Sequence, residues 1–176
     1  MMRARVVSLV SASLVLSIVS TNSLAAITRV HTSETFQFSV AARMAVAFPL
    51  FGANRERLWA QDWEPVFIWP SEPDDRSGMV FTVAHGERQA TWVNTDFDPI
   101  AGHIRYVYVL PEVMTTVITL RLREHHAATD VQVRYERTSL NEAADERVRE
   151  LARQDAVAGP EWASQIANYL TRRPAR

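Results

Sequence analysis

The sequence predicts an α+β fold, in which a curved antiparallel sheet of about six to seven strands wraps a long C-terminal helix. Alternating apolar and polar residues run from residue 79 to residue 137, a period typical of antiparallel strands with one face in water. Two short helical segments follow a first strand, and an amphipathic stretch follows the last one. This order lays the long helix across the sheet, and we expect an apolar pocket between the two.

The segment before residue 79 combines short elements. Residues 33–40 alternate in polarity and predict the first strand. The alanine-rich residues 41–50 predict a short helix, and Asn54 is placed to cap a second one. Residues 66–69 lie between two prolines and predict a short strand.

The main strands are joined by tight turns. Gly86 and Glu87 predict a two-residue turn, and this register places Phe81 opposite Trp92 on the apolar face. His85 falls on the same face at the end of its strand. Further alternation predicts strands at residues 104–110, 114–123 and 131–137.

The C-terminal region predicts one amphipathic helix with a break. Ser139 and Glu142 have capping-box spacing, so we expect the helix to begin near Leu140 or Asn141. Gly159 and Pro160 should kink or break it. Its apolar stripe comprises Val148, Leu151, Ala152, Trp162, Ile166, Tyr169 and Leu170.

The N-terminus has the pattern of an export signal. Two arginines precede the uncharged apolar run 6–20, and small residues lead up to Ala25 and Ala26. The pattern predicts a signal peptide over residues 1–25, cleaved near Ala25 or Ala26, and one domain over 26–176. We therefore expect a periplasmic or secreted protein; the alternative is an uncleaved N-terminal segment that anchors the domain to the membrane.

Composition narrows the classes of function. The chain has 176 residues with a net charge of −1, which does not favour a nucleic-acid partner. It has no cysteine, so it has no thiolate ligand or nucleophile. The histidines lack the spacing of a zinc motif, and glycines form no phosphate loop. We expect no metal and no cofactor, and the oligomeric state is not indicated.

The order of the motifs resembles a known superfamily. A W-x-P motif at 63–65, a strand carrying Trp92 and the terminal motif W-x-x-x-I-x-x-Y-L at 162–170 occur in sequence. This order resembles the START-like superfamily SRPBCC, which includes polyketide cyclase/dehydrases, lipid-transfer START domains and Bet v 1-like proteins. The resemblance spans roughly residues 32–172 and implies a helix-grip fold with a hydrophobic cavity between sheet and helix. That scaffold serves binding, transport and catalysis alike.

The candidate site residues are those that alternation and the resemblance place toward the cavity. His85 and Asn94 are the expected polar orienters; the alternatives are an ordinary strand-end histidine that bonds to its turn, and an asparagine satisfied within the sheet. Inward tyrosines and tryptophans supply apolar walls. The predicted ligand-binding residues are Phe81, Val83, His85, Trp92, Asn94, Tyr106, Tyr108, Ile118, Val133, Tyr135, Trp162 and Ile166.

The leading hypothesis is an exported protein that binds a small hydrophobic molecule, lipid-like or aromatic and polyketide-like. The alternatives are a cyclase- or dehydratase-type enzyme that uses the same cavity, and an envelope interaction protein whose core is filled. No catalytic pair is evident in the sequence. Arginines predicted on the outer sheet face indicate either a solvated surface or a peripheral contact with anionic lipid: Arg121, Arg123, Arg134 and Arg137.

Overall fold

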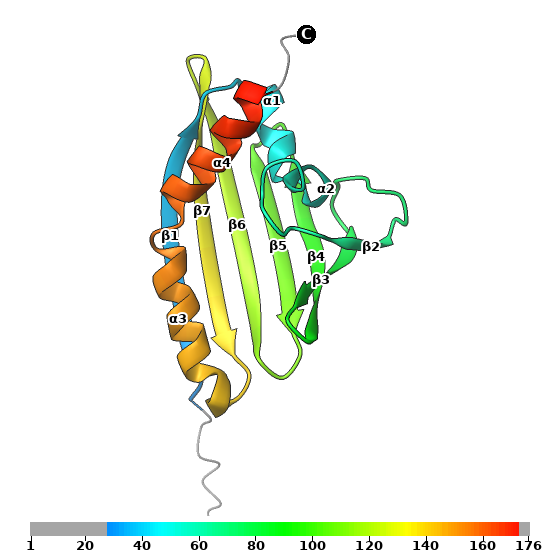
Figure 1. The fold of residues 1–176 in the computed structure, drawn as a ribbon, viewed down its shortest axis with the longest axis vertical. Helices are drawn as coiled ribbons and strands as arrows, with labels where there is room; N and C mark the ends of the chain where they lie inside the picture. The colour runs from blue at the N-terminus through cyan, green and yellow to red at the C-terminus, as the bar shows by residue number, and fades with distance from the viewer. Residues whose placement is uncertain (1–27, 173–176) are drawn as a thin grey trace, which may run out of the picture.

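A computed structural model describes residues 28–172, so the predicted signal peptide lies outside the described residues. Within this range seven strands form one antiparallel sheet in the order β1-β7-β6-β5-β4-β3-β2 (Figure 1). The predicted α+β class is confirmed. The strands are β1 (His31–Val40), β2 (Val66–Trp69), β3 (Val80–His85), β4 (Arg88–Asp98), β5 (His103–Leu110), β6 (Met114–His125) and β7 (Ala128–Ser139).

Strand pairing follows the alternation of the sequence. Phe81 pairs with Trp92, and His85 pairs with Arg88 across a two-residue turn, as predicted. Gly86 has a φ of 62° in this turn, which glycine adopts without steric cost. Along β6 every second residue is buried against the helices: Met114, Thr116, Ile118, Leu120 and Leu122.

The helices form two groups on the same face of the sheet. Figure 1 shows α3 and α4 lying end to end along β1 and β7, with α1 beside the upper end of α4, while α2 and β2 lie toward the opposite edge. Among residues 28–172, no helix is both long enough and apolar enough to cross a membrane. The helices are α1 (Met44–Ala47), η1 (Phe48–Phe51), α2 (Ala53–Glu56), η2 (Glu142–Ala144), α3 (Asp145–Asp155) and α4 (Gly159–Arg172).

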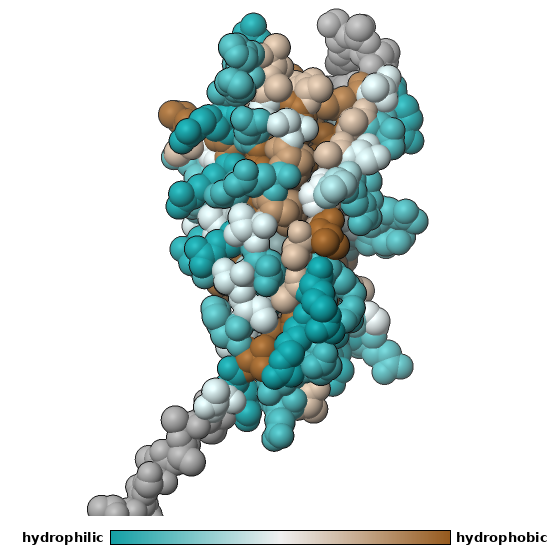
Figure 2. Space-filling model, turned by 90° about the vertical axis from the view of Figure 1, so that its left-hand side faces the viewer, coloured by the Kyte–Doolittle hydropathy of each residue, from teal (hydrophilic) through white to brown (hydrophobic). Residues whose placement is uncertain are grey.

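The predicted break in the C-terminal helix is confirmed, because α3 ends at Asp155 and α4 begins at Gly159. Gly159 is buried against β1, where a Cβ atom would lie 3.1 Å from the carbonyl oxygen of Gln37 and 3.4 Å from the ring of Phe36. Glycine thus lets the start of α4 approach the strand closely. Figure 2 looks onto this edge of the molecule and shows hydrophobic residues in a band between hydrophilic ones.

The cap of the C-terminal helical segment differs from the prediction. Asn141 is the N-cap, and its side-chain oxygen accepts a 2.9 Å hydrogen bond from the Ala144 amide. Ser139 remains in β7 and donates its hydroxyl to Asp145. The capping box is therefore wrong, because the serine ends the strand and the asparagine two residues later satisfies the free amides.

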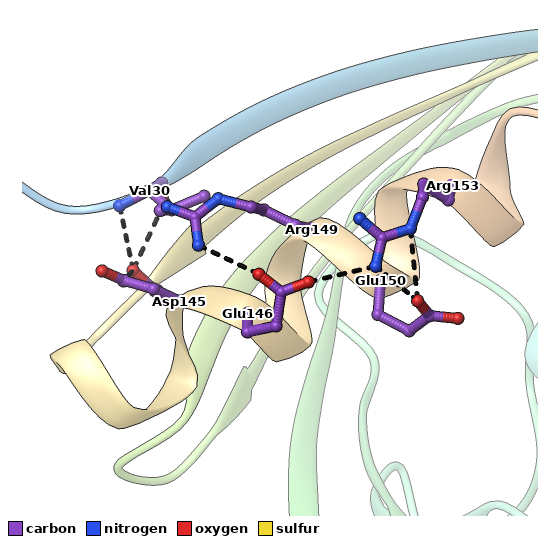
Figure 3. A network of polar contacts seen from close by, with 7 residues as sticks. Val30, Asp145, Glu146, Arg149, Glu150 and Arg153 are labelled. Atoms are coloured by element: carbon purple, nitrogen blue, oxygen red, sulfur yellow. Dashed lines mark hydrogen bonds and ion pairs between the residues drawn. The ribbon is translucent and has the colours of Figure 1, made fainter.

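The outer face of α3 carries a ladder of ion pairs (Figure 3). Arg149 lies 3.2 Å from Glu146, and Arg153 lies 3.1 Å from Glu146 and 2.6 Å from Glu150. Hydrogen bonds from Arg153 and Arg149 lower the pKa of Glu146 below its usual value. Exposed pairs of this kind add little stability, so the apolar face of α3 holds it to the sheet.

Candidate functional site

An open cavity of about 1090 Å³ lies between the sheet and the helices. Its walls come from the end of α2 and the segment after it, from strands β3 to β7, and from η2, α3 and α4. Exposed charged residues, among them Arg88, Glu112 and Glu161, stand among its lining. A smaller cavity of about 60 Å³ lies deeper against the sheet and includes Phe81 and Tyr106. The cavity volume suits a small organic ligand.

The two cavities meet at a set of residues that line both, which we call the neck: Glu56, Trp63, Trp92, Tyr135 and Trp162. The rings of Trp63 and Trp92 meet edge to face with centroids 5.4 Å apart. The neck is thus a set of aromatic rings with one carboxyl group among them.

Aromatic side chains hold the segment that carries Glu56. Trp59 donates its indole N–H to the Leu50 carbonyl at 2.7 Å, and Trp63 donates to the Ala53 carbonyl at 2.8 Å. The Tyr106 hydroxyl donates to the Phe51 carbonyl at 3.0 Å. These bonds satisfy buried carbonyls that short helices leave free. They also fix α2, whose last residue is Glu56.

The Glu56 carboxyl group is the chemically unusual group of the site. No hydrogen bond to its side chain is found among the described residues. Burial raises the pKa of Glu56 to about 8, and the nearby carboxylate of Asp75 adds to the rise. At pH 7 the group is therefore mainly protonated and can donate a hydrogen bond. In its ionised form it can pair with a cation.

Arg137 is buried inside the site rather than exposed on the outer face. Its guanidinium group makes a bidentate pair with Asp155, at 2.6 and 2.8 Å. It also donates to the Tyr108 hydroxyl at 2.6 Å and lies 4.6 Å from the ring centroid of Tyr135. The predicted outer position of Arg137 is wrong, because its alternation follows Val133 and Tyr135 toward the helices.

His85 lies in the outer part of the cavity. Its ring stacks on Tyr108 with centroids 6.0 Å apart. Burial lowers the pKa of His85, and the positive charges of Arg137 and Arg147 lower it further. The ring is therefore neutral at pH 7 and can orient a ligand as either a donor or an acceptor.

The structure brings most of the predicted site residues together. Phe81, Tyr106 and Ile118 line the inner cavity, while His85 and Tyr108 line the outer one. Those that line both cavities are Trp92, Tyr135 and Trp162.

The other predicted residues line neither cavity. Val83, Val133 and Ile166 pack into the hydrophobic core. Asn94 is fully buried opposite Tyr106 at a bulge of β4, and its side-chain amide has no hydrogen-bond partner among the described residues. Asn94 thus lies on the same buried face as Trp92 but lines neither cavity.

Sequence reasoning missed Glu56, Arg137 and Asp155. Arg137 shares the alternation of the buried β7 residues, and Asp155 lies seven positions after Val148 on the apolar stripe. The sequence pattern therefore indicates that this arginine and this aspartate are both buried. Glu56 gave no such signal, because its helix is a single turn. Among the described residues, no group of His, Asp and Glu could hold a metal ion.

Comparison with known proteins identifies the fold. No family model matches the chain, and no curated protein matches it in sequence. Solved structures do match, and we report three. Norcoclaurine synthase from Thalictrum flavum, in complex with dopamine and hydroxybenzaldehyde, is 12% identical with a TM-score of 0.60, covering 94% of this chain and 100% of that one. Ara h 8.0201 is 10% identical with a TM-score of 0.60, and the match covers 81% of this chain and 99% of that one.

The third structure, an uncharacterized protein from Rhizobium leguminosarum, is 17% identical with a TM-score of 0.58 and covers 83% of this chain and 98% of that one. At these identities the similarity shows the fold alone. The chain has the Bet v 1-like helix-grip fold. The resemblance to the START-like superfamily is confirmed at the level of the fold.

Proposed function

We propose that the protein is an exported binding protein, which holds a small and largely apolar molecule in the cavity between the sheet and the C-terminal helices. The observation that carries this proposal is the continuity of the cavity, about 1090 Å³ in volume, with an aromatic neck. Burial of apolar ligand surface against these rings supplies roughly 25 cal/mol per Å². A structure of the same fold contains the small aromatic molecules dopamine and hydroxybenzaldehyde, which supports a ligand of this size.

The proposal is tested by filling the cavity from α3. Leu151 lines the cavity, and Leu151→Trp should lower the affinity for the neutral probe N-phenyl-1-naphthylamine at least about tenfold, because the larger side chain occupies the ligand volume. Val157→Trp is the matched control, since Val157 is 72% exposed and lies outside the cavity. Equal probe binding by both variants, or no binding by the wild-type protein, would contradict the proposal.

Export and a natural ligand are tested together by native mass spectrometry of the protein recovered from its producing cell. A mature chain that begins after Ala25 or Ala26 supports export with cleavage. A co-purified small molecule that Leu151→Trp excludes supports the binding function. A full-length chain in the membrane fraction supports the anchored alternative.

A second candidate function is catalysis of the cyclase or dehydratase kind, and one observation favours it. Glu56 is a carboxyl group in an aromatic enclosure, and its pKa of about 8 lies near the pH at which proton transfer is efficient. Conversion of the co-purified molecule by the wild-type protein but not by Glu56→Gln would support catalysis. The open cavity argues against the third hypothesis, a core filled by the protein's own side chains.

A further inference from the structure

The charges of the site do not balance at the neck. Arg137 is neutralised by Asp155 through two hydrogen bonds, and it lies against Tyr135. Glu56 has no such partner among the described residues, and the carboxylate of Asp75 lies near enough to raise its pKa. An ionised Glu56 would therefore be a half-buried charge without a counter-ion, which is unfavourable unless a ligand supplies one.

The other residues of the neck are aromatic. The indole N–H of Trp63 donates to the Ala53 carbonyl, and the indole nitrogen of Trp92 is buried and has no hydrogen-bond partner among the described residues. The ring of Trp92 stacks with Phe81 and with Tyr108, at centroid distances of 5.6 and 4.1 Å, which leaves Trp63 and Trp162 as the tryptophans of the neck without a stacked neighbour. Ring faces attract cations through their quadrupoles, most strongly for tryptophan.

We infer that the neck binds an organic cation, an ammonium group at the end of an otherwise apolar ligand, with Glu56 as the counter-ion and the rings of Trp63 and Trp162 beside it. This inference rests on the proposed function and specifies the class of ligand. A carboxylate together with aromatic faces complements an ammonium group in both charge and dispersion. A neutral ligand of the same shape would lack the contribution from charge.

The inference gives a defined dependence on pH. A cation favours the ionised form of Glu56, so the affinity for a permanently charged ligand should rise about tenfold per pH unit up to pH 8 and then level off. His85 stays neutral above pH 7, because burial and nearby arginines lower its pKa. The rise is therefore assigned to Glu56. The titratable and charged groups that face it or share its cavities are Asp62, Asp75, His85, Arg88, Tyr106, Tyr108, Glu112, Tyr135, Arg137, Arg147 and Glu161.

The test compares two probes of the same shape, benzyltrimethylammonium and its neutral isostere neopentylbenzene, by tryptophan fluorescence from pH 6 to pH 9. The wild-type protein should prefer the cation at least about tenfold at pH 8.5, and its affinity should fall at lower pH. Glu56→Gln should lose that preference and the pH dependence while retaining the neutral probe. Glu64→Gln is the matched control, since Glu64 is exposed and lines neither cavity.

The outcomes separate this inference from the proposed function. Equal binding of both probes, or a cation preference that survives in Glu56→Gln, overturns the cation site and leaves the apolar binding function intact. Binding of neither probe also overturns the cation site. In that case the comparison of Leu151→Trp with Val157→Trp decides independently whether the cavity takes apolar ligands.

Discussion

Replacing Glu56 with glutamine keeps the shape of the side chain and removes its ionisation. Burial raises the pKa of Glu56 to about 8 in the folded protein, from 4.5 as the ordinary value. Between these two pH values the folded state holds a proton on Glu56 that the unfolded state has lost. The contribution of Glu56 to the free energy of unfolding is therefore fully present below pH 4.5 and is lost as the pH rises through about 8.

The magnitude follows from the shift. Each pH unit between the two pKa values lowers the free energy of unfolding by about 1.4 kcal/mol, which gives an upper bound of about 5 kcal/mol. The variant Glu56→Gln lacks this loss, so its stability relative to the wild-type protein should increase from pH 5 to pH 8 and be constant above pH 9.

Urea unfolding followed by tryptophan fluorescence at pH 5, 6, 7, 8 and 9 measures this difference. Glu64→Gln, the exposed control, should track the wild-type protein at every pH. A difference between Glu56→Gln and the wild-type protein that is the same at pH 5 and pH 9 would refute the assignment of a buried, unpaired carboxyl group. Such a result would also remove the basis for a counter-ion at the neck.

Other predictions concern the remaining parts of the site and the fold. Asp155→Asn leaves the buried guanidinium group of Arg137 without its counter-ion and should lower the free energy of unfolding by about 3–5 kcal/mol, and a loss below about 1 kcal/mol in urea titration would contradict this. Gly102→Ala places a Cβ atom 2.2 Å from the Leu122 carbonyl oxygen at a φ of 67°, so a fall in melting temperature is expected. His85→Ala should weaken binding of a polar-headed ligand a few-fold, with unchanged unfolding, and unchanged affinity would remove its role as an orienter.

The strands and their pairing could be predicted from the sequence, because alternation with period two reports directly which side of a sheet is buried. Phe81 opposite Trp92 followed from the turn length alone. The broken C-terminal helix followed from Gly159 and Pro160, whose effects on the backbone are local. These features depend on residues that are neighbours in the sequence, so they can be predicted without the tertiary structure.

The chemistry of the site depends on long-range contacts, and most of it could not be predicted. Glu56 owes its environment to aromatic rings from β4, β7 and α4, which the sequence separates widely from α2. Asn94 keeps the alternation of Trp92 and is buried on that face, yet neither cavity reaches it, which alternation alone does not indicate. Arg137 was missed for a different reason. Its position in the alternation of β7 predicts a buried side chain, whereas its charge favours an exposed one.

The close approach of Gly159 to β1 has a consequence for the design of the cavity wall. The first residue of α4, Gly159, packs directly against β1. The start of α4 is therefore positioned by the sheet. Insertions or deletions in α3 would alter the outer half of the wall and leave Trp162 in place. If the cavity binds a ligand as proposed, changes in α3 would alter one part of its wall while Trp162 stays at the neck.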